Sequence, residues 1–141
     1  MAGFLFCIIA GAAMSIQGVM NTRLGESIGT MEANVFVQVT AALLSIAALL
    51  FYHTGSFSGF LETNKLYWLG GVFGLIITVT VMLGIKALSP TVAISTILIA
   101  QLTVAALIDA FGLMGSEKAA FGWQQFAGLA LMIGGMLLFK R

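Results

Sequence analysis

Apolar residues dominate five stretches of the chain, and polar and charged residues collect between them. The stretches cover about 3–21, 33–52, 66–86, 91–111 and 121–139, and each is close to the 20 apolar residues that a bilayer-spanning helix needs. Segments of alternating apolar and polar positions, which are typical of a membrane β-barrel, are absent from the sequence. Because only helices satisfy all their backbone groups in lipid without closing a sheet, the pattern predicts an all-α, polytopic membrane protein, a single domain over 1–141.

The residues between the five apolar stretches are typical of connectors and helix ends, which supports five separate helices. Segment 53–65 is the longest connector and carries the Gly, Ser and charged residues of an aqueous loop. Ser89 followed by Pro90 predicts an N-cap and a first helical position, so the fourth helix is expected to begin there. Amphipathic aromatic rings are expected at the membrane interface, and four of them lie at predicted span ends: Tyr52, Tyr67, Trp68 and Trp123.

Composition agrees with a bilayer as the solvent of this chain. Hydrophobic residues make up 60% of the 141 residues and charged residues only 8%, whereas soluble domains carry about 25% charged residues. The formal net charge is +1 and no basic stripe is visible, so a nucleic-acid partner is not expected.

Lysine and arginine near the span ends give a weak orientation signal. Five spans place the two termini on opposite sides. The face with the N-terminus holds two basic residues, Lys65 and Lys118, and the other face holds four: Arg23, Lys86, Lys140 and Arg141. The bias favours a cytoplasmic C-terminus, but it is small enough that one or two charges would reverse it, which leaves room for insertion in both orientations.

Residues for catalysis or metal binding are scarce. His53 is the only histidine and Cys7 the only cysteine, so no zinc or iron site, and no cofactor, is expected. The glycine-rich segment 70–75 lacks the lysine and hydroxyl of a phosphate-binding loop. No nucleophile–base pair is evident, and the sequence does not predict an enzyme.

Polar residues inside the apolar stretches are the candidates for function. Gln17 and Asn21 are four residues apart and share a helix face, and Asn34 and Gln38 repeat this spacing on the second stretch. The third stretch carries Thr78 and Thr80 near its midpoint. The fourth carries four polar residues and then a carboxylate: Ser95, Thr96, Gln101, Thr103 and Asp109.

Each of these groups also has a purely structural interpretation. Ser and Thr hydroxyls often bond to the carbonyl of the preceding turn, and Gln17, Gln38 and Gln101 could join helices at about 0.6 kcal/mol each. Asp109 could pair with a loop lysine. Three amides on three helices at similar depths, however, favour a polar cavity, since polar groups in spans usually face the interior or water.

Five short helices leave little space for such a cavity inside one chain. Two antiparallel copies would give ten helices with the inverted symmetry of many secondary transporters, whose sites lie at the midplane between halves. The weak charge bias is what a dual-oriented chain would show.

The chain also resembles a known family over nearly its whole length. The resemblance rests on "GAAMSIQGVMNTRLGESIG", "YWLGGVFGL", "LSPTVAISTILIAQLTVAALIDAFGLMG" and "GWQQFAGLALMIGGMLLF". These segments look like the drug/metabolite transporter superfamily, and within it the YdcZ family of small five-helix bacterial inner-membrane proteins. The spacing from Gln101 to Asp109, followed by Phe-Gly-Leu, is its most distinctive element.

The resemblance implies a half-size counterpart of ten-helix EamA-type transporters, multi-pass in the inner membrane. It implies an antiparallel homodimer, or a heterodimer with an oppositely oriented paralogue. The positions that match the family's polar pattern are Gln17, Asn21, Gln101 and Asp109. The small multidrug-resistance exporters look like more distant relatives with an acid on the first helix. This chain has only Gln17 there, so the resemblance does not imply the proton-coupled exchange of those exporters.

Together these observations predict a secondary transporter that moves a small polar or amphipathic solute by alternating access. We expect Gln17, Asn21 and Gln101 to bind the solute and Asp109 to serve coupling or gating. The residues expected to line the cavity are Gln38, Thr78 and Thr103. Two alternatives stay open: a dual-topology channel lined by threonine hydroxyls, and a scaffold that binds another membrane protein through its glycine faces.

Overall fold

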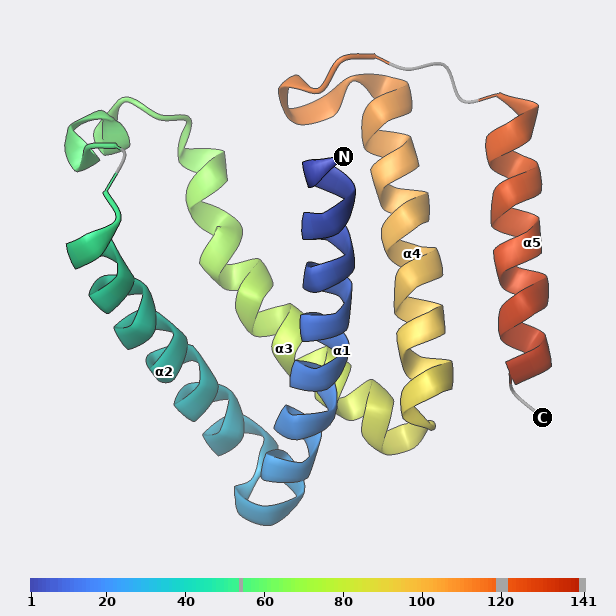
Figure 1. Ribbon diagram of the computed structural model, residues 1–141, viewed down its shortest axis with the longest axis horizontal. Helices are drawn as coiled ribbons and strands as arrows, with labels where there is room; N and C mark the ends of the chain where they lie inside the picture. Colours follow the sequence, from blue (N-terminus) through green and yellow to red (C-terminus); the bar gives the residue numbers. More distant parts are fainter. Residues whose placement is uncertain (54, 119–121, 140–141) are drawn as a thin grey trace. The chain divides into compact units, whose positions relative to one another are not determined.

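The computed structural model describes residues 1–53, 55–118 and 122–139, and within these ranges the regular structure is entirely helical (Figure 1). The predicted all-α class is confirmed. Phe121, where the fifth stretch was expected to begin, and Lys140 and Arg141, which entered the charge comparison, lie outside the described residues.

Five α-helices follow one another in the described ranges, one for each apolar stretch. Their bounds are α1 (Ala2–Ile28), α2 (Thr30–Phe51), α3 (Gly70–Ala87), α4 (Pro90–Phe111) and α5 (Trp123–Phe139). Three 3-10 turns lie between them: η1 (Phe57–Leu61), η2 (Lys65–Leu69) and η3 (Leu113–Gly115).

Four of these helices are long and apolar enough to cross a membrane: α1, α2, α3 together with the preceding turn, and α4. Helix α5 has 17 described residues, or about 26 Å of helix, which is the lower limit of what crosses a 30 Å hydrocarbon core. Membrane crossing by α5 therefore stays a prediction.

Helices α1 and α2 are longer than the apolar pattern predicted. The expected end near residue 21 and the expected start at residue 33 both fall inside helices, because α1 continues to Ile28 and α2 begins at Thr30. Hydropathy marks the part of a helix that lies in lipid, whereas the helix itself continues until its backbone is interrupted. The 27 residues of α1 span about 40 Å, more than the thickness of the hydrocarbon core.

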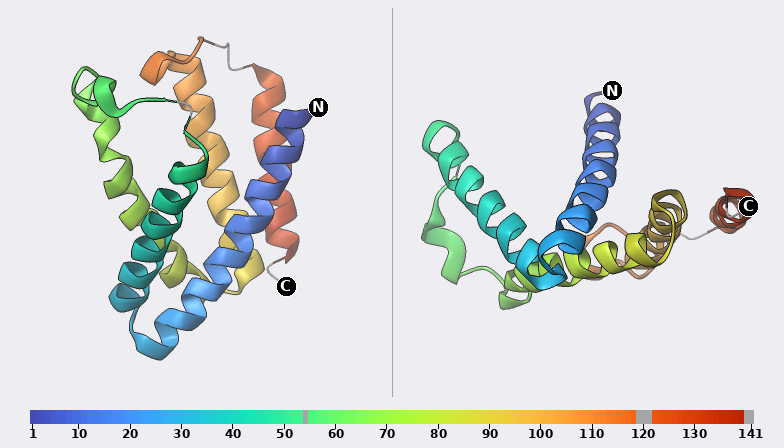
Figure 2. Two further views of the ribbon diagram at one scale, coloured as in Figure 1. Left: turned by 60° about the vertical axis from the view of Figure 1, so that its left-hand side comes forward. Right: turned by 90° about the horizontal axis from the view of Figure 1, so that it is seen from below.

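Gly29 is the single residue that joins α1 to α2. Its φ of 105° and ψ of 145° lie in a region that only glycine adopts readily. Its N–H donates to Gly25 O at 3.0 Å and its carbonyl accepts from Ala33 N at 3.0 Å, so the turn satisfies backbone groups of both helices. From this turn α1 and α2 diverge, as the blue and teal helices of Figure 2 show.

The connector between α2 and α3 is ordered by local caps and one aromatic pair. Ser56 Oγ accepts from Ser58 N at 3.1 Å, and Asn64 Oδ1 accepts from Leu66 N at 3.0 Å. The rings of Phe60 and Trp68 stack with centroids 4.6 Å apart. This pairing holds Trp68, one of the aromatics expected at the interface, against the connector.

Helix α4 has the caps that its flanking residues predict. Ser89 Oγ accepts from Val92 N at 3.4 Å and Pro90 occupies the first helical position, so the predicted start is confirmed. At the other end Gly112 adopts a left-handed conformation with φ 63°, and its N–H donates to Asp109 O at 3.3 Å.

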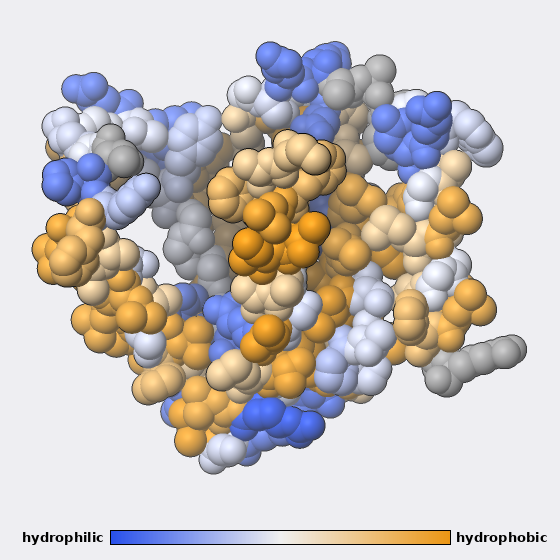
Figure 3. Space-filling model, viewed as in Figure 1, coloured by the Kyte–Doolittle hydropathy of each residue, from blue (hydrophilic) through white to orange (hydrophobic). Residues whose placement is uncertain are grey.

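The chain divides into two compact units, Met1–Lys86 and Ala87–Arg141. Few apolar side chains are buried in either one: Ala33, Met82 and Ile85 in the first unit, and Ala93 in the second. Hydrophobic residues cover the middle of the helices and hydrophilic residues gather at their connected ends (Figure 3). Apolar surface of this extent suits lipid rather than water.

Candidate functional site

A small polar cleft lies between α1 and α3 in the first unit. Its volume is about 50 Å³, which is room for roughly three water molecules. All three of its polar residues were predicted from the sequence: Gln17 and Asn21 one turn apart on α1, and Thr78 on α3. The rest of the lining is apolar: Met14, Gly18, Ile77 and Val81.

Gly18 allows α1 and α3 to approach closely at this cleft. A Cβ at position 18 would lie 3.0 Å from Ile85 Cδ1 and 3.1 Å from Val81 Cγ1, which is too close without movement of those side chains. The missing side chain therefore sets the spacing of the two helices, as small residues do in membranes.

The hydroxyl groups near the cleft are already engaged with the backbone. Thr78 Oγ1 donates to Gly74 O at 2.9 Å, and Thr22 Oγ1 donates to Gly18 O at 2.7 Å. The structural interpretation of the hydroxyls thus holds here, and also at Thr80 and Thr103.

The amides of the cleft, in contrast, have no hydrogen-bond partner among the described residues. Asn21 is buried, with 8% of its surface exposed, and Gln17 is exposed. Because an amide offers two donors and an acceptor with two lone pairs, these two side chains hold most of the free hydrogen-bonding capacity of the cleft.

Helix α2 places two more amides beside the same helices. Gln38 is half-buried, and its Nε2 would lie 3.6 Å from a Cβ on Gly74, one turn before Thr78 on α3. Asn34, one turn before Gln38, is only 3% exposed, and its Oδ1 has no hydrogen-bond partner. Asn34 was not among the predicted site residues. In the sequence, its position four residues before Gln38 could have identified it, because this spacing places both amides on one face of α2.

The lining of the cleft carries no charged side chain. The nearest charged residues along α1, Arg23 and Glu26, form an ion pair with each other at 2.9 Å. Among the described residues, no group of three or more His, Cys, Asp or Glu side chains could hold a metal ion.

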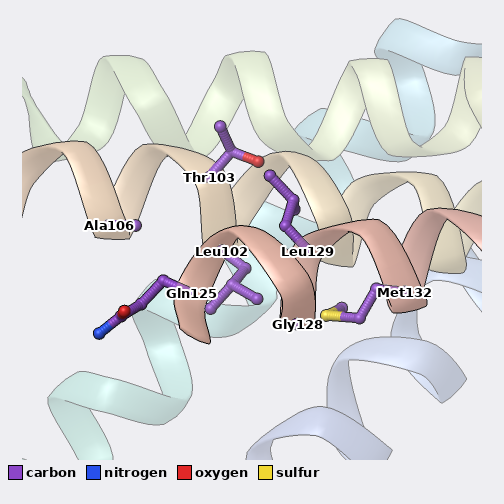
Figure 4. Close-up of a pocket in the computed structure, with 7 residues that line it drawn as sticks. All are labelled: Leu102, Thr103, Ala106, Gln125, Gly128, Leu129 and Met132. Atoms are coloured by element: carbon purple, nitrogen blue, oxygen red, sulfur yellow. The ribbon is translucent and has the colours of Figure 1, made fainter. Parts of the chain in front are cut away.

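The second unit contains a larger and mostly apolar cavity of about 320 Å³ between α4 and α5 (Figure 4). Thr103 of α4 lines it, as do Leu102, Ala106, Gln125, Gly128, Leu129 and Met132. Figure 4 shows Ala106 and Gln125 at one end and Met132 toward the other. Gln125 Oε1 accepts from Gly122 N at 2.9 Å, a capping contact that fixes this side chain at the start of α5.

Gln101 lies on a different side of α4 from Thr103. Two residues of helix separate them by about 200°, so Thr103 faces α5 while Gln101 lines a shallow apolar groove on α4 itself. Gln101 is exposed and has no hydrogen-bond partner among the described residues.

Asp109 is exposed in the last turn of α4. The described residues place no basic group within ion-pair distance of it, so the lysine partner considered from the sequence is not seen. An acid in this position also faces the negative end of the helix dipole, which does not favour it.

The predicted site residues thus fall into separate groups. The first unit brings Gln17, Asn21 and Thr78 together, with Gln38 on the adjoining helix. In the second unit Thr103, Gln101 and Asp109 occupy three positions on α4, and one cavity does not hold them all.

Long apolar helices around a small uncharged polar cleft define an integral membrane protein with a candidate solute site. The chain belongs to the YdcZ family of the drug/metabolite transporters, whose sequence model, described as "Putative inner membrane exporter, YdcZ", matches residues 2–138. It is accordingly a protein of the inner membrane. No curated protein and no solved structure was found to match the chain.

Proposed function

We propose that this chain is one subunit of a secondary transporter that moves a small polar or amphipathic solute by alternating access. The observation that carries the proposal is the cleft itself, where two amides without partners, Gln17 and Asn21, lie in a mostly apolar lining. Membership of an exporter family is consistent with it. Polar groups at this depth cost free energy unless they meet water, a solute or another polar group.

An antiparallel pair of chains is the assembly that we propose. A cleft of about 50 Å³ admits a few waters or one polar group of a solute but not a whole metabolite, so we propose that the amides of one copy form only part of the site. Two inverted copies would place two such clefts around one central path, with Gln101 of each copy as a further solute contact. The exposed, unpartnered state of Gln101 supports this role, since an amide facing lipid is unfavourable.

The cavity of the second unit extends the proposal to amphipathic solutes. Its volume of about 320 Å³ is within the range of small-molecule sites, and its lining is apolar except near Thr103 and Gln125. An apolar part of a solute would fit between α4 and α5, beside the Gln125 side chain of the same lining. Asp109, exposed and without a described ion-pair partner, would couple or gate transport.

The proposal is tested by reconstituting the purified protein in liposomes and measuring counterflow of a panel of labelled polar and amphipathic solutes. Gln17→Leu and Asn21→Leu should each abolish counterflow of the transported solute. Val39→Leu, on the exposed apolar surface of α2, should leave it intact. Equal counterflow in all three variants would remove the cleft from the mechanism.

Crosslinking tests the arrangement of the subunits separately. Cysteines at Gln17 and Gln101, introduced one at a time after Cys7→Ser, should crosslink between subunits and react with aqueous thiol reagents. If neither position faces an accessible dimer centre, the proposed site is wrong even where transport is observed.

A further inference from the structure

We infer that Asn34 binds the solute, and that its buried amide oxygen accepts a hydrogen bond from an uncharged donor group, a hydroxyl or an amide N–H. This inference rests on the proposed function and names the substrate class of the same site. Asn34 Oδ1 is fully buried without a hydrogen-bond partner, the only side-chain N or O atom in this state among the residues that the structure describes. Such an acceptor is destabilising unless a donor from outside the chain reaches it.

The contacts among three helices place Asn34 near the cleft, although Asn34 is not part of its lining. Toward one end of the first unit, a Cβ on Gly25 of α1 would lie 3.4 Å from Met82 Sδ of α3 and 3.8 Å from Ala33 Cβ of α2. Farther along, Gln38 of α2 contacts Gly74 of α3. Asn34 lies between these two contacts on α2.

The matching positions on the other helices are the polar residues of the cleft. Thr78 lies between Met82 and Gly74 on α3, and Asn21 lies one turn before Gly25 on α1. Asn21 is a second amide that is more than nine-tenths buried and has no partner in the described chain. One unpartnered amide, Asn21, therefore lines the cleft, and a second, Asn34, lies on the adjoining helix outside that lining.

The chemistry of this cleft favours an uncharged ligand. Its lining has no charged side chain, and the Arg23–Glu26 pair is already neutralised within α1. A charged group would lose its hydration there without a counter-charge, whereas a hydroxyl or amide would exchange hydrogen bonds with water for hydrogen bonds with Asn21 and Asn34.

The test measures ligand protection at the cleft and does not require a known substrate. Met14→Cys, in the Cys7→Ser protein, supplies a thiol in the lining, and its reaction with 2-hydroxyethyl methanethiosulfonate is followed in detergent. Acetamide and glycerol, as uncharged donors, should slow labelling severalfold, while acetate and tetramethylammonium should not. Equal protection by the charged probes, or none by the uncharged ones, overturns the inference.

Substitution of Asn34 separates binding from packing. Asn34→Leu should eliminate protection by acetamide while leaving the midpoint of thermal unfolding unchanged or raised, because an unsatisfied acceptor is removed. Val35→Leu, on the exposed side of α2, should retain protection. A lowered midpoint with full protection would mean that Asn34 is a packing residue only.

A second pair of variants keeps the inference testable if Asn34→Leu does not fold. Asn34→Cys should react with the same reagent, and its neighbour Ala33→Cys should not, although Ala33 is also buried at 0% exposure. If Asn34→Cys reacts but neither acetamide nor glycerol slows the reaction, position 34 is reached by water and the reagent but not by the solute class proposed. That result overturns solute binding by Asn34. If acetamide and glycerol protect the cleft but the unmodified protein shows no counterflow, only the transporter proposal is contradicted.

Discussion

Gly18 of α1 lies directly against Ile85 of α3, and a Cβ on this glycine would stand 3.0 Å from Ile85 Cδ1. This contact, together with that of Val81, brings α1 and α3 together beside the polar cleft. In lipid, close packing of this kind replaces the hydrophobic effect as the force that holds helices together.

We therefore expect Gly18→Leu to destabilise the protein by about 1–3 kcal/mol, the usual cost of forcing extra atoms into a packed contact. The measurement is the free energy of unfolding in mixed detergent micelles. Gly11→Leu is the matched control, because Gly11 is on the same helix and a Cβ added there would meet no neighbouring atom within 4 Å. Equal stability of the two variants would show that the Gly18 contact does not form in the micelle.

The turn between α1 and α2 gives a second prediction. Gly29→Ala should cost about 1–3 kcal/mol, because a Cβ is strained at φ 105° and would also overlap the carboxylate of Glu32. The free energy of unfolding measures the cost, and Gly55→Ala, where a Cβ meets open space, is the control.

A double variant separates the two causes of this cost. Glu32→Ala in the Gly29→Ala background removes the overlap but leaves the backbone strain, so it should recover only part of the loss. Full recovery would show that the backbone conformation of Gly29 contributes nothing.

The sequence predicted the helices well where hydropathy and capping chemistry act locally. Apolar stretches marked all five helices, and Ser89 with Pro90 marked the start of α4. Hydropathy could not predict the last residue of α1 or the first residue of α2. Helix α1 continues past the apolar stretch through Arg23 and Glu26, and ends only where Gly29 interrupts it.

The candidate site was only partly accessible from the sequence. The four-residue spacing of Gln17 and Asn21 placed both on one face, and the structure shows both in one cleft. The burial of Asn34 depends on how α2 packs against its neighbours, which no local pattern contains. The helical period alone separates Gln101 from Thr103, so a single cavity on α4 could not have held both.

The apolar cavity of the second unit gives a third prediction. Ala106→Leu should fill part of the space between α4 and α5, raising the free energy of unfolding by about 1 kcal/mol through new packing contacts. The same variant should reduce counterflow of amphipathic solutes more than that of polar ones. Leu107→Ile, an exposed neighbour outside the cavity, should change neither property. Unchanged selectivity in Ala106→Leu would exclude the cavity from solute binding.

Asp109 provides a test of coupling. Asp109→Asn keeps the size of the side chain and removes a negative charge from the C-terminal turn of α4, so stability should stay equal or rise. If the carboxylate couples transport, uptake driven by an ion gradient should be lost while solute counterflow is retained. Glu117→Gln, in the following loop, is the matched control and should preserve both. Gradient-driven uptake by Asp109→Asn at the unmodified rate would contradict the coupling role.

Dual insertion is tested through the basic residues of the connectors. A reporter fused to the C-terminus should give signal from both sides of the membrane, since the two faces carry two and four basic residues. The double variant Lys65→Gln, Lys118→Gln leaves no basic residue on the face with the N-terminus and four on the other face. It should therefore direct the C-terminus to the cytoplasm. Glu62→Gln with Glu117→Gln should have little effect, because acids contribute weakly to orientation. A single orientation of the unmodified chain would count against a self-paired antiparallel dimer, and a partner chain of opposite orientation would then be required to complete the inverted pair.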